Sequence, residues 1–159
     1  MGNRVRRVRR AVMWVLVVLG VLLVVGAVVA DPIGLDLTPG FGVLQTLAFL
    51  IGVTLLTIAV YLYLMEPRSS GSPRSLQADI GIRLSLTGLV LCYVSGFADL
   101  IHIGTHIQPE FERPFMGPLQ SAGLILGLIV LVAGILLYYT SRRQRPASSL
   151  EFILNGKKK

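Results

Sequence analysis

The sequence predicts an all-α membrane protein, built as a four-span antiparallel transmembrane helical bundle with short loops. Hydrophobic residues make up 53% of the 159 residues and charged residues only 14%, whereas a soluble domain carries about 25% charge. The apolar residues are gathered into four runs of bilayer length, about 20 residues each. Nearly all basic residues lie in the segments on one side of those runs. Together these observations indicate that lipid, and not water, surrounds most of the chain.

Each predicted span is a long apolar run with few or no charges. In hydrocarbon, backbone amides must find hydrogen-bond partners in an α-helix or in a closed β-barrel. A barrel strand would be only about ten residues long and of alternating polarity, so these longer apolar runs indicate helices. The links are short and polar, which requires neighbouring helices to run antiparallel. The predicted spans cover about residues 11–30, 41–65, 82–105 and 117–139, within a transmembrane domain of residues 11–140.

The basic residues predict the orientation of the bundle. Residues 1–10 are a basic N-terminal segment and residues 141–159 are a basic tail. If both termini are cytoplasmic, every Lys and Arg except Arg113 lies on the cytoplasmic side, as the positive-inside rule requires. We therefore expect a multi-pass protein of a bacterial-type inner (cell) membrane. The net charge of +7 then reports orientation against anionic lipid, and no nucleic-acid partner is expected.

Residues 1–30 leave one alternative open. This segment has the general layout of a cleavable signal peptide, with arginines first, then an apolar run, and then Val28-Val29-Ala30 ahead of Asp31. The apolar run exceeds the usual 7 to about 15 residues, which favours an uncleaved anchor. Cleavage would leave three spans.

Small and polar residues predict which helix faces pack inside the bundle, because apolar residues alone do not drive helix association in lipid. The Val-rich first span has few such residues and is expected to face lipid. Gly123 and Gly127 in the fourth span form a GxxxG spacing that favours packing within the chain, with self-association as the alternative. The other predicted inward faces are Thr54, Thr57 and Tyr61 in the second span, and Ser85, Gly88, Cys92, Ser95 and Gly96 in the third.

One constellation in the sequence has the residue types for chemistry, at the outer end of the third span. Spacings of three and four place Asp99, His102 and His106 on one helix face. A His pair at i and i+4 can chelate one metal ion, and the carboxylate can be a third ligand or can orient a histidine. This donor set suits a divalent metal such as zinc. The favoured interpretation is a structural polar cluster, and the alternatives are the metal site and a proton-linked or ligand-gating role.

Several activities have no support in the sequence. The chain has two histidines, and because they share one helix face a monomer cannot supply both axial ligands of a haem. No GxSxG, P-loop or HExxH motif occurs, and the single Cys92 excludes an intrachain disulfide. The sequence thus favours an accessory or scaffolding subunit, with no catalysis of its own and no firmly implied cofactor. Its expected partners are the lipid bilayer and other membrane subunits, or a second copy. The alternatives are an outer-face divalent-metal-binding membrane protein and a proton-linked, transporter-like oligomer.

Overall fold

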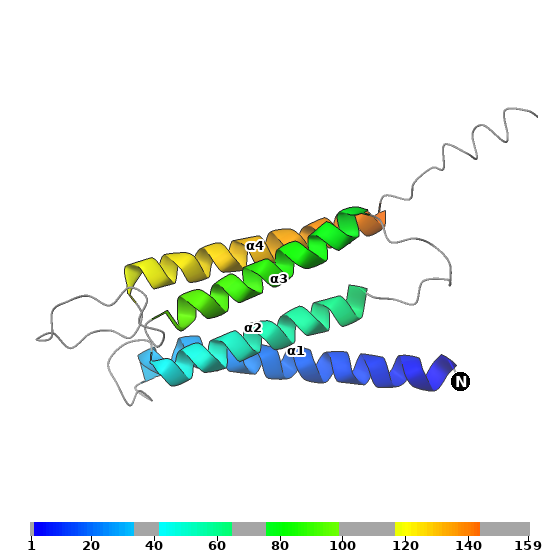
Figure 1. Ribbon diagram of the computed structural model, residues 1–159. Helices are drawn as coiled ribbons and strands as arrows, with labels where there is room; N and C mark the ends of the chain where they lie inside the picture. The colour runs from blue at the N-terminus through cyan, green and yellow to red at the C-terminus, as the bar shows by residue number, and fades with distance from the viewer. Residues whose placement is uncertain (1, 34–41, 65–75, 99–116, 144–159) are drawn as a thin grey trace, which may run out of the picture.

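The computed structural model describes residues 2–33, 42–64, 76–98 and 117–143, and these segments form four α-helices (Figure 1). No strand occurs in the described segments. All four helices are long and apolar enough to cross a membrane, which confirms the predicted all-α, four-helix membrane class. The helices are α1 (Gly2–Ile33), α2 (Val43–Leu64), α3 (Leu76–Gly96) and α4 (Pro118–Arg143).

Successive helices run antiparallel, so the start of α1 and the end of α4 lie at the same end of the bundle (Figure 1). We call this end, where α1 and α3 begin and α2 and α4 end, the basic end. The other end, where α1 and α3 end and α2 and α4 begin, is called the opposite end. This up-down-up-down order is the one that short links between long helices require.

The four helices form two hairpins that lie side by side. The backbones of α1 and α2 approach closely at many positions, and those of α3 and α4 do the same. By contrast, α2 and α3 approach closely at few positions. Figure 1 shows α1 and α2 as one layer and α3 and α4 as the other. Helix α2 therefore lies between α1 and the second hairpin.

Helix α1 includes the basic segment as well as the first apolar run. It begins at Gly2, so the arginines at positions 4 to 10 belong to the helix instead of preceding it. Arginine is a good helix former. The backbone N–H and C=O groups of the valines that follow can form hydrogen bonds in lipid only within the helix. Its buried residues are Gly20 and Ala27, whereas most of its large side chains are exposed. The apolar circumference that was expected to face lipid is thus exposed in the structure.

Helices α2 and α4 begin with the same hydrogen-bonded cap. The Gly42 N–H donates to Gln45 Oε1 at 2.7 Å, and the Gly117 N–H donates to Gln120 Oε1 at 2.8 Å. A Gln three residues into the helix that accepts from the preceding backbone is half of a capping box. Pro118 follows Gly117 at the first helical position, where its missing N–H has no cost. Both helix starts at the opposite end are therefore defined locally.

Helix α3 begins at Leu76, ahead of the predicted start at residue 82. The earlier start brings two charged side chains into the helix, and they neutralise each other one turn apart: Arg83 Nη2 lies 2.9 Å from Asp79 Oδ2. Asp79 also lies in the first turn, where the helix dipole favours a negative charge. Residues 99–105 of the predicted span lie outside the described residues.

Candidate functional site

The closest helix contact in the bundle is a seam of small residues between α3 and α4. A Cβ added to Gly88 would lie 2.7 Å from the Gly127 carbonyl oxygen and 2.8 Å from Leu131 Cα. A Cβ added to Gly81 would lie 2.7 Å from the Tyr138 backbone nitrogen. Backbone atoms cannot move aside, so the two helices can approach this closely only where side chains are absent.

The seam follows one stripe on each helix. The buried positions alternate in steps of three and four residues, the spacing of helices that pack at a small crossing angle. On α3 the buried stripe is Ala78, Gly81, Ser85, Gly88 and Cys92, and on α4 it is Leu124, Gly127, Leu131, Gly134, Tyr138 and Ser141.

The structure confirms the inward face predicted for the third span. Ser85, Gly88, Cys92 and Gly96 are all buried. Leu86, Val90 and Val94, on the side expected to face lipid, are exposed.

The GxxxG pair of the fourth span packs within the chain. A Cβ on Gly127 would lie 2.6 Å from Cys92 Sγ and 2.9 Å from the Gly88 carbonyl oxygen. Gly123 faces the Ser95 side chain. Packing of Gly123 and Gly127 inside the monomer was the favoured interpretation of the sequence, and the structure agrees with it.

Cys92 is part of this seam and has no exposed surface. Its thiol donates to the Leu124 carbonyl oxygen at a distance of 3.6 Å. The sulfur lies against Gly127, where a larger residue on α4 would displace it. The thiol therefore fills space between α3 and α4.

Two pairs of hydroxyl groups join α2 to α3 across the boundary between the hairpins. The Tyr61 and Ser85 hydroxyl oxygens are 2.5 Å apart, and those of Thr54 and Tyr93 are 2.9 Å apart. Ser85 donates to the Ile82 carbonyl oxygen and Thr54 to the Leu50 carbonyl oxygen. Since a hydroxyl has only one proton to donate, each tyrosine is the donor across the boundary.

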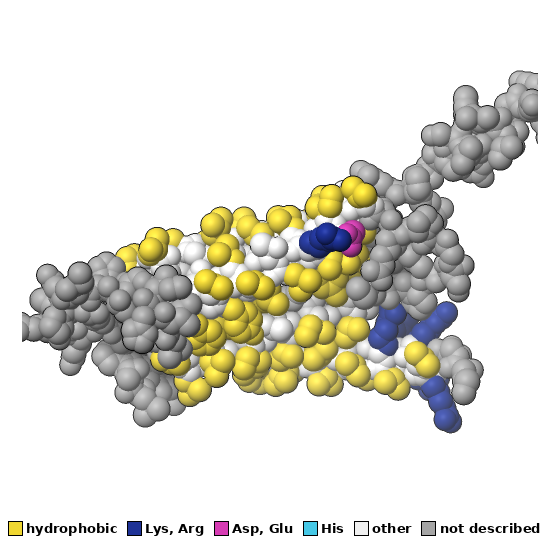
Figure 2. Space-filling model, in the orientation of Figure 1, with side chains coloured by type: hydrophobic (Ala, Val, Ile, Leu, Met, Phe, Trp, Pro, Cys, Tyr) yellow, Lys and Arg dark blue, Asp and Glu magenta, His cyan; other side chains and the backbone are white. Residues whose placement is uncertain are grey.

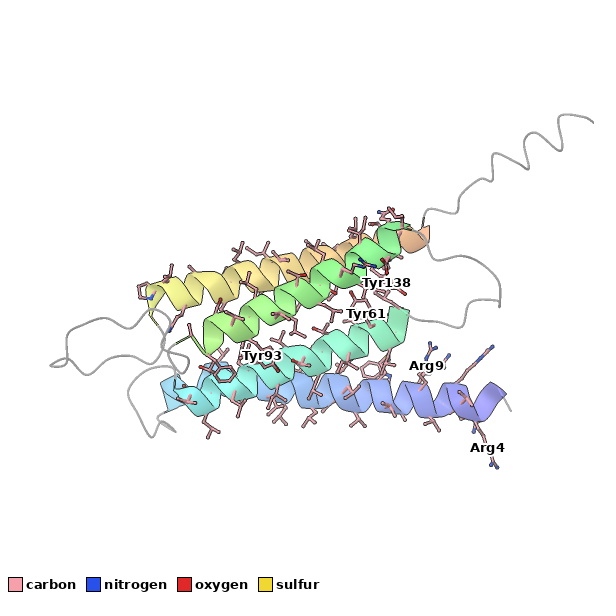
Figure 3. All side chains as sticks on the ribbon, viewed as in Figure 1. Arg4, Arg9, Tyr61, Tyr93 and Tyr138 are labelled. Carbon is pink, nitrogen blue, oxygen red and sulfur yellow. The ribbon has the colours of Figure 1, made fainter. Side chains whose placement is uncertain are left out.

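Tyr138 extends the contact between the hairpins toward the basic end. Its ring packs edge-on against the Tyr61 ring, with centroids 5.4 Å apart and an interplanar angle of 69°, a favourable geometry for aromatic rings. Figure 3 shows Tyr61 and Tyr138 near one another and Tyr93 farther along the same boundary. Around them is an apolar cluster of Leu64, Ala78 and Tyr138 with Val60, Tyr61, Ile82 and Ile135.

The predicted inward face of the second span is present in this boundary. Thr57 is buried, and its hydroxyl donates to the Val53 carbonyl oxygen at 2.8 Å. Tyr93 and Tyr138 were not predicted from the sequence. Tyr138 has a usable signal, because it lies four residues after Gly134 and so continues the stripe of the fourth span. Tyr93 has no such signal, because it directly follows Cys92 and lies beside the small-residue stripe.

The predicted Asp99, His102 and His106 cluster lies outside the described residues. Within the described segments, no group of three or more His, Cys, Asp or Glu residues could hold a metal ion. The interior polar side chains that the structure does describe hydrogen-bond to backbone carbonyls or to each other across helices. These hydrogen bonds stabilise the described helices and the contacts between them.

The described basic side chains gather toward the basic end, as Figure 2 shows in dark blue. Arg83 on α3 is paired with Asp79. The others belong to the first turns of α1, and they are Arg4, Arg6, Arg7, Arg9 and Arg10. Figure 3 shows Arg4 pointing away from the bundle and Arg9 pointing toward the side of α1 on which α2 lies.

No family model matches this chain, and neither a curated protein nor a solved structure is significantly similar to it. The four apolar helices are those of a small multi-pass membrane protein.

Proposed function

We propose that this chain is an accessory or scaffolding subunit of a bacterial-type inner membrane, with both termini in the cytoplasm and no catalysis of its own. The observation that carries this proposal is the one-sided packing of α1. Its contacts follow one stripe against α2, centred where Gly20 meets Gly52 and Leu56. The remaining circumference consists of large exposed apolar side chains such as Val15 and Leu22. Most of the circumference of a transmembrane helix is thus available to a neighbouring subunit.

The chemistry of the interior supports the same proposal. The hydroxyls of Thr54, Tyr61, Ser85 and Tyr93 hold helices together. Glycines bring α3 and α4 into close contact. A tightly packed interior of this kind suits a protein that presents its outer surface to other chains, because small and polar residues stabilise helix contacts in lipid.

The orientation is supported by charge. Arg4 and the other arginines of α1 lie at the basic end, which is also the end where α4 finishes. The cytoplasmic side of a membrane protein carries the excess of Lys and Arg. We therefore place the basic end in the cytoplasm.

Site-specific photocrosslinking tests the accessory role. A photoreactive residue at Leu22, which is 63% exposed on α1, is expected to form one reproducible adduct with a single membrane protein at native expression level. The same partner is expected to co-purify in stoichiometric amount in mild detergent. A photoreactive residue at Leu50, which has no exposed surface, is the control and is expected to give no such adduct. Lipid adducts alone at Leu22, together with isolation of the chain as a lone monomer, would contradict the proposal.

A further inference from the structure

Along one face of α1, basic side chains are followed by an aromatic ring and then by apolar side chains. A phospholipid presents its charged headgroup, its interfacial region and its acyl chains in the same order along the membrane normal. On a helix, residues three, four and seven apart share a face, which places Arg7 and Arg10 in line with Trp14. The Trp14 side chain is 62% exposed, and both arginines are exposed. The same face continues toward the opposite end with exposed valines. This set, called the Trp14 face below, is Arg7, Arg10, Trp14, Val18, Val21 and Val25.

Exposed aromatic side chains mark the level of the membrane interface at the basic end. Gly20 of α1 contacts Leu56, and Val24 contacts Gly52, so the antiparallel register brings Trp14 to the level of Tyr63. Tyr63 is exposed on α2, as is Tyr139 on α4. Tryptophan and tyrosine concentrate at membrane–water interfaces, where one part of the ring is in apolar surroundings and the other is wet. The rings of Trp14 and Tyr63, which lie at one level, therefore indicate where hydrocarbon ends.

The arginines lie at the height of the lipid phosphates relative to that level. At a rise of 1.5 Å per residue, Arg10 lies about 6 Å beyond Trp14 and Arg7 about 10 Å beyond it. The headgroup layer on each side of a bilayer is roughly 5 to 7 Å thick. Arginine side chains are long and flexible, so both guanidinium groups are within reach of the phosphate layer. Below Trp14, Val18, Val21 and Val25 face the acyl region.

We propose that the Trp14 face binds an anionic phospholipid, with Arg7 and Arg10 on the headgroup phosphate and the valines against the acyl chain. The guanidinium group is the side chain best matched to phosphate, through paired N–H donors. The proposed ligand is a lipid and not a free phosphate ion, because the exposed apolar surface continues directly from the arginines. This inference needs only a membrane-embedded α1 and does not depend on the accessory role.

Trp14 makes the test direct, because it is the single tryptophan of the chain and its fluorescence reports only on this face. The full-length protein is reconstituted into vesicles that contain phosphatidylcholine and phosphatidylglycerol in equal amounts. Either the phosphatidylglycerol or the phosphatidylcholine carries brominated acyl chains, which quench tryptophan on contact. Bound anionic lipid predicts an enrichment of phosphatidylglycerol around Trp14 of roughly threefold or more, since each arginine near the surface attracts anionic lipid appreciably. Raising the salt concentration is expected to reduce this enrichment.

Matched variants separate the Trp14 face from net charge. R7Q/R10Q is expected to abolish the enrichment, so that brominated phosphatidylcholine quenches Trp14 as strongly as brominated phosphatidylglycerol does. This quenching also shows that Trp14 is still in the membrane. K157Q/K158Q removes the same charge outside α1 and is expected to keep the enrichment. Equal quenching by the two brominated lipids in the unmodified protein would overturn the proposal, as would loss of the preference in the Lys variant with retention in R7Q/R10Q. Absence of a phosphatidylglycerol preference in chloride, together with a change in Trp14 fluorescence when inorganic phosphate replaces chloride at equal ionic strength, would instead identify a free-phosphate site and refute lipid binding.

Discussion

Glycines that look alike in the sequence occupy opposite environments in the bundle. Gly88 lies where α3 meets α4, and an added Cβ would be 2.7 Å from the Gly127 carbonyl oxygen. Gly26 on α1 has no neighbouring atom within 4 Å of the same added atom. The contribution of a glycine to stability therefore depends on the helix facing it.

This contrast gives a first prediction. Gly88→Ala is expected to force α3 and α4 apart and to lower the free energy of unfolding by roughly 1 to 3 kcal/mol, the usual cost of overpacking. Gly26→Ala, the matched control, is expected to leave stability almost unchanged. Unfolding in mixed detergent and sodium dodecyl sulfate micelles, followed by circular dichroism, measures both variants. Equal effects of the two substitutions would show that the α3–α4 seam does not stabilise the protein.

The metal-site hypothesis is also tested at the residue scale. If Asp99, His102 and His106 bind a divalent ion, the purified protein is expected to retain about one zinc equivalent. The His102→Ala/His106→Ala double variant then loses it, because imidazoles are the main ligands. Elemental analysis after dialysis against a weak chelator measures the difference. Equal metal content in the two proteins would remove the metal hypothesis and leave the structural polar cluster.

At the scale of helices, α2 makes two different kinds of contact. It meets α1 through the close approach of Gly20 and Gly52. It meets α3 through side chains and the hydroxyl pairs of Tyr61 with Ser85 and of Thr54 with Tyr93. Hydrogen bonds between membrane helices contribute only about 0.6 kcal/mol on average. The boundary between α2 and α3 therefore depends on side-chain packing and weak hydrogen bonds, whereas close backbone contacts at glycines lie on either side of it.

The tyrosine hydroxyls provide a prediction for this boundary. Tyr61→Phe is expected to lower stability by about 0.5 to 1.5 kcal/mol, because Ser85 loses its donor from α2. A double-mutant cycle with Ser85→Ala is expected to show coupling between the two side chains. Tyr63→Phe removes the hydroxyl of an exposed tyrosine two residues away and is expected to have almost no effect. An uncoupled cycle would mean that the Tyr61–Ser85 hydrogen bond contributes nothing to packing of the hairpins.

The elements also show how much could be predicted from the sequence. The four helices and the inward face of α3 could be predicted, because run length, charge and helical periodicity act within one helix. The pairing of that face with Gly127 and Gly134 could not, because periodicity defines a face without identifying its partner. The helices begin at Gly2 and Leu76, earlier than the predicted spans. The spans were predicted from apolar runs, whereas a helix can continue past an apolar run through charged residues such as Asp79 and Arg83. The Asp99 cluster stays a prediction.

At the scale of the whole molecule, the four helices match one bilayer. From Trp14 to Ile33, α1 extends about 28 Å, and the 22 residues of α2 extend about 33 Å. The hydrocarbon core is about 30 Å thick. The start of α1 and the end of α4 lie at the same end, together with the described arginines. The charge and the antiparallel order thus support one orientation for the whole chain.

Cysteine labelling in intact cells tests that orientation most directly. Cys92→Ala supplies a background without thiols, since Cys92 is the only cysteine. Leu76→Cys and Leu119→Cys then place single thiols at matched positions, 80% and 79% exposed, at the basic end and the opposite end. A membrane-impermeant maleimide is expected to label Leu119→Cys in intact cells and Leu76→Cys only after the membrane is permeabilised. Labelling of Leu76→Cys in intact cells, or of both positions from one side, would contradict a four-span bundle with its basic end in the cytoplasm.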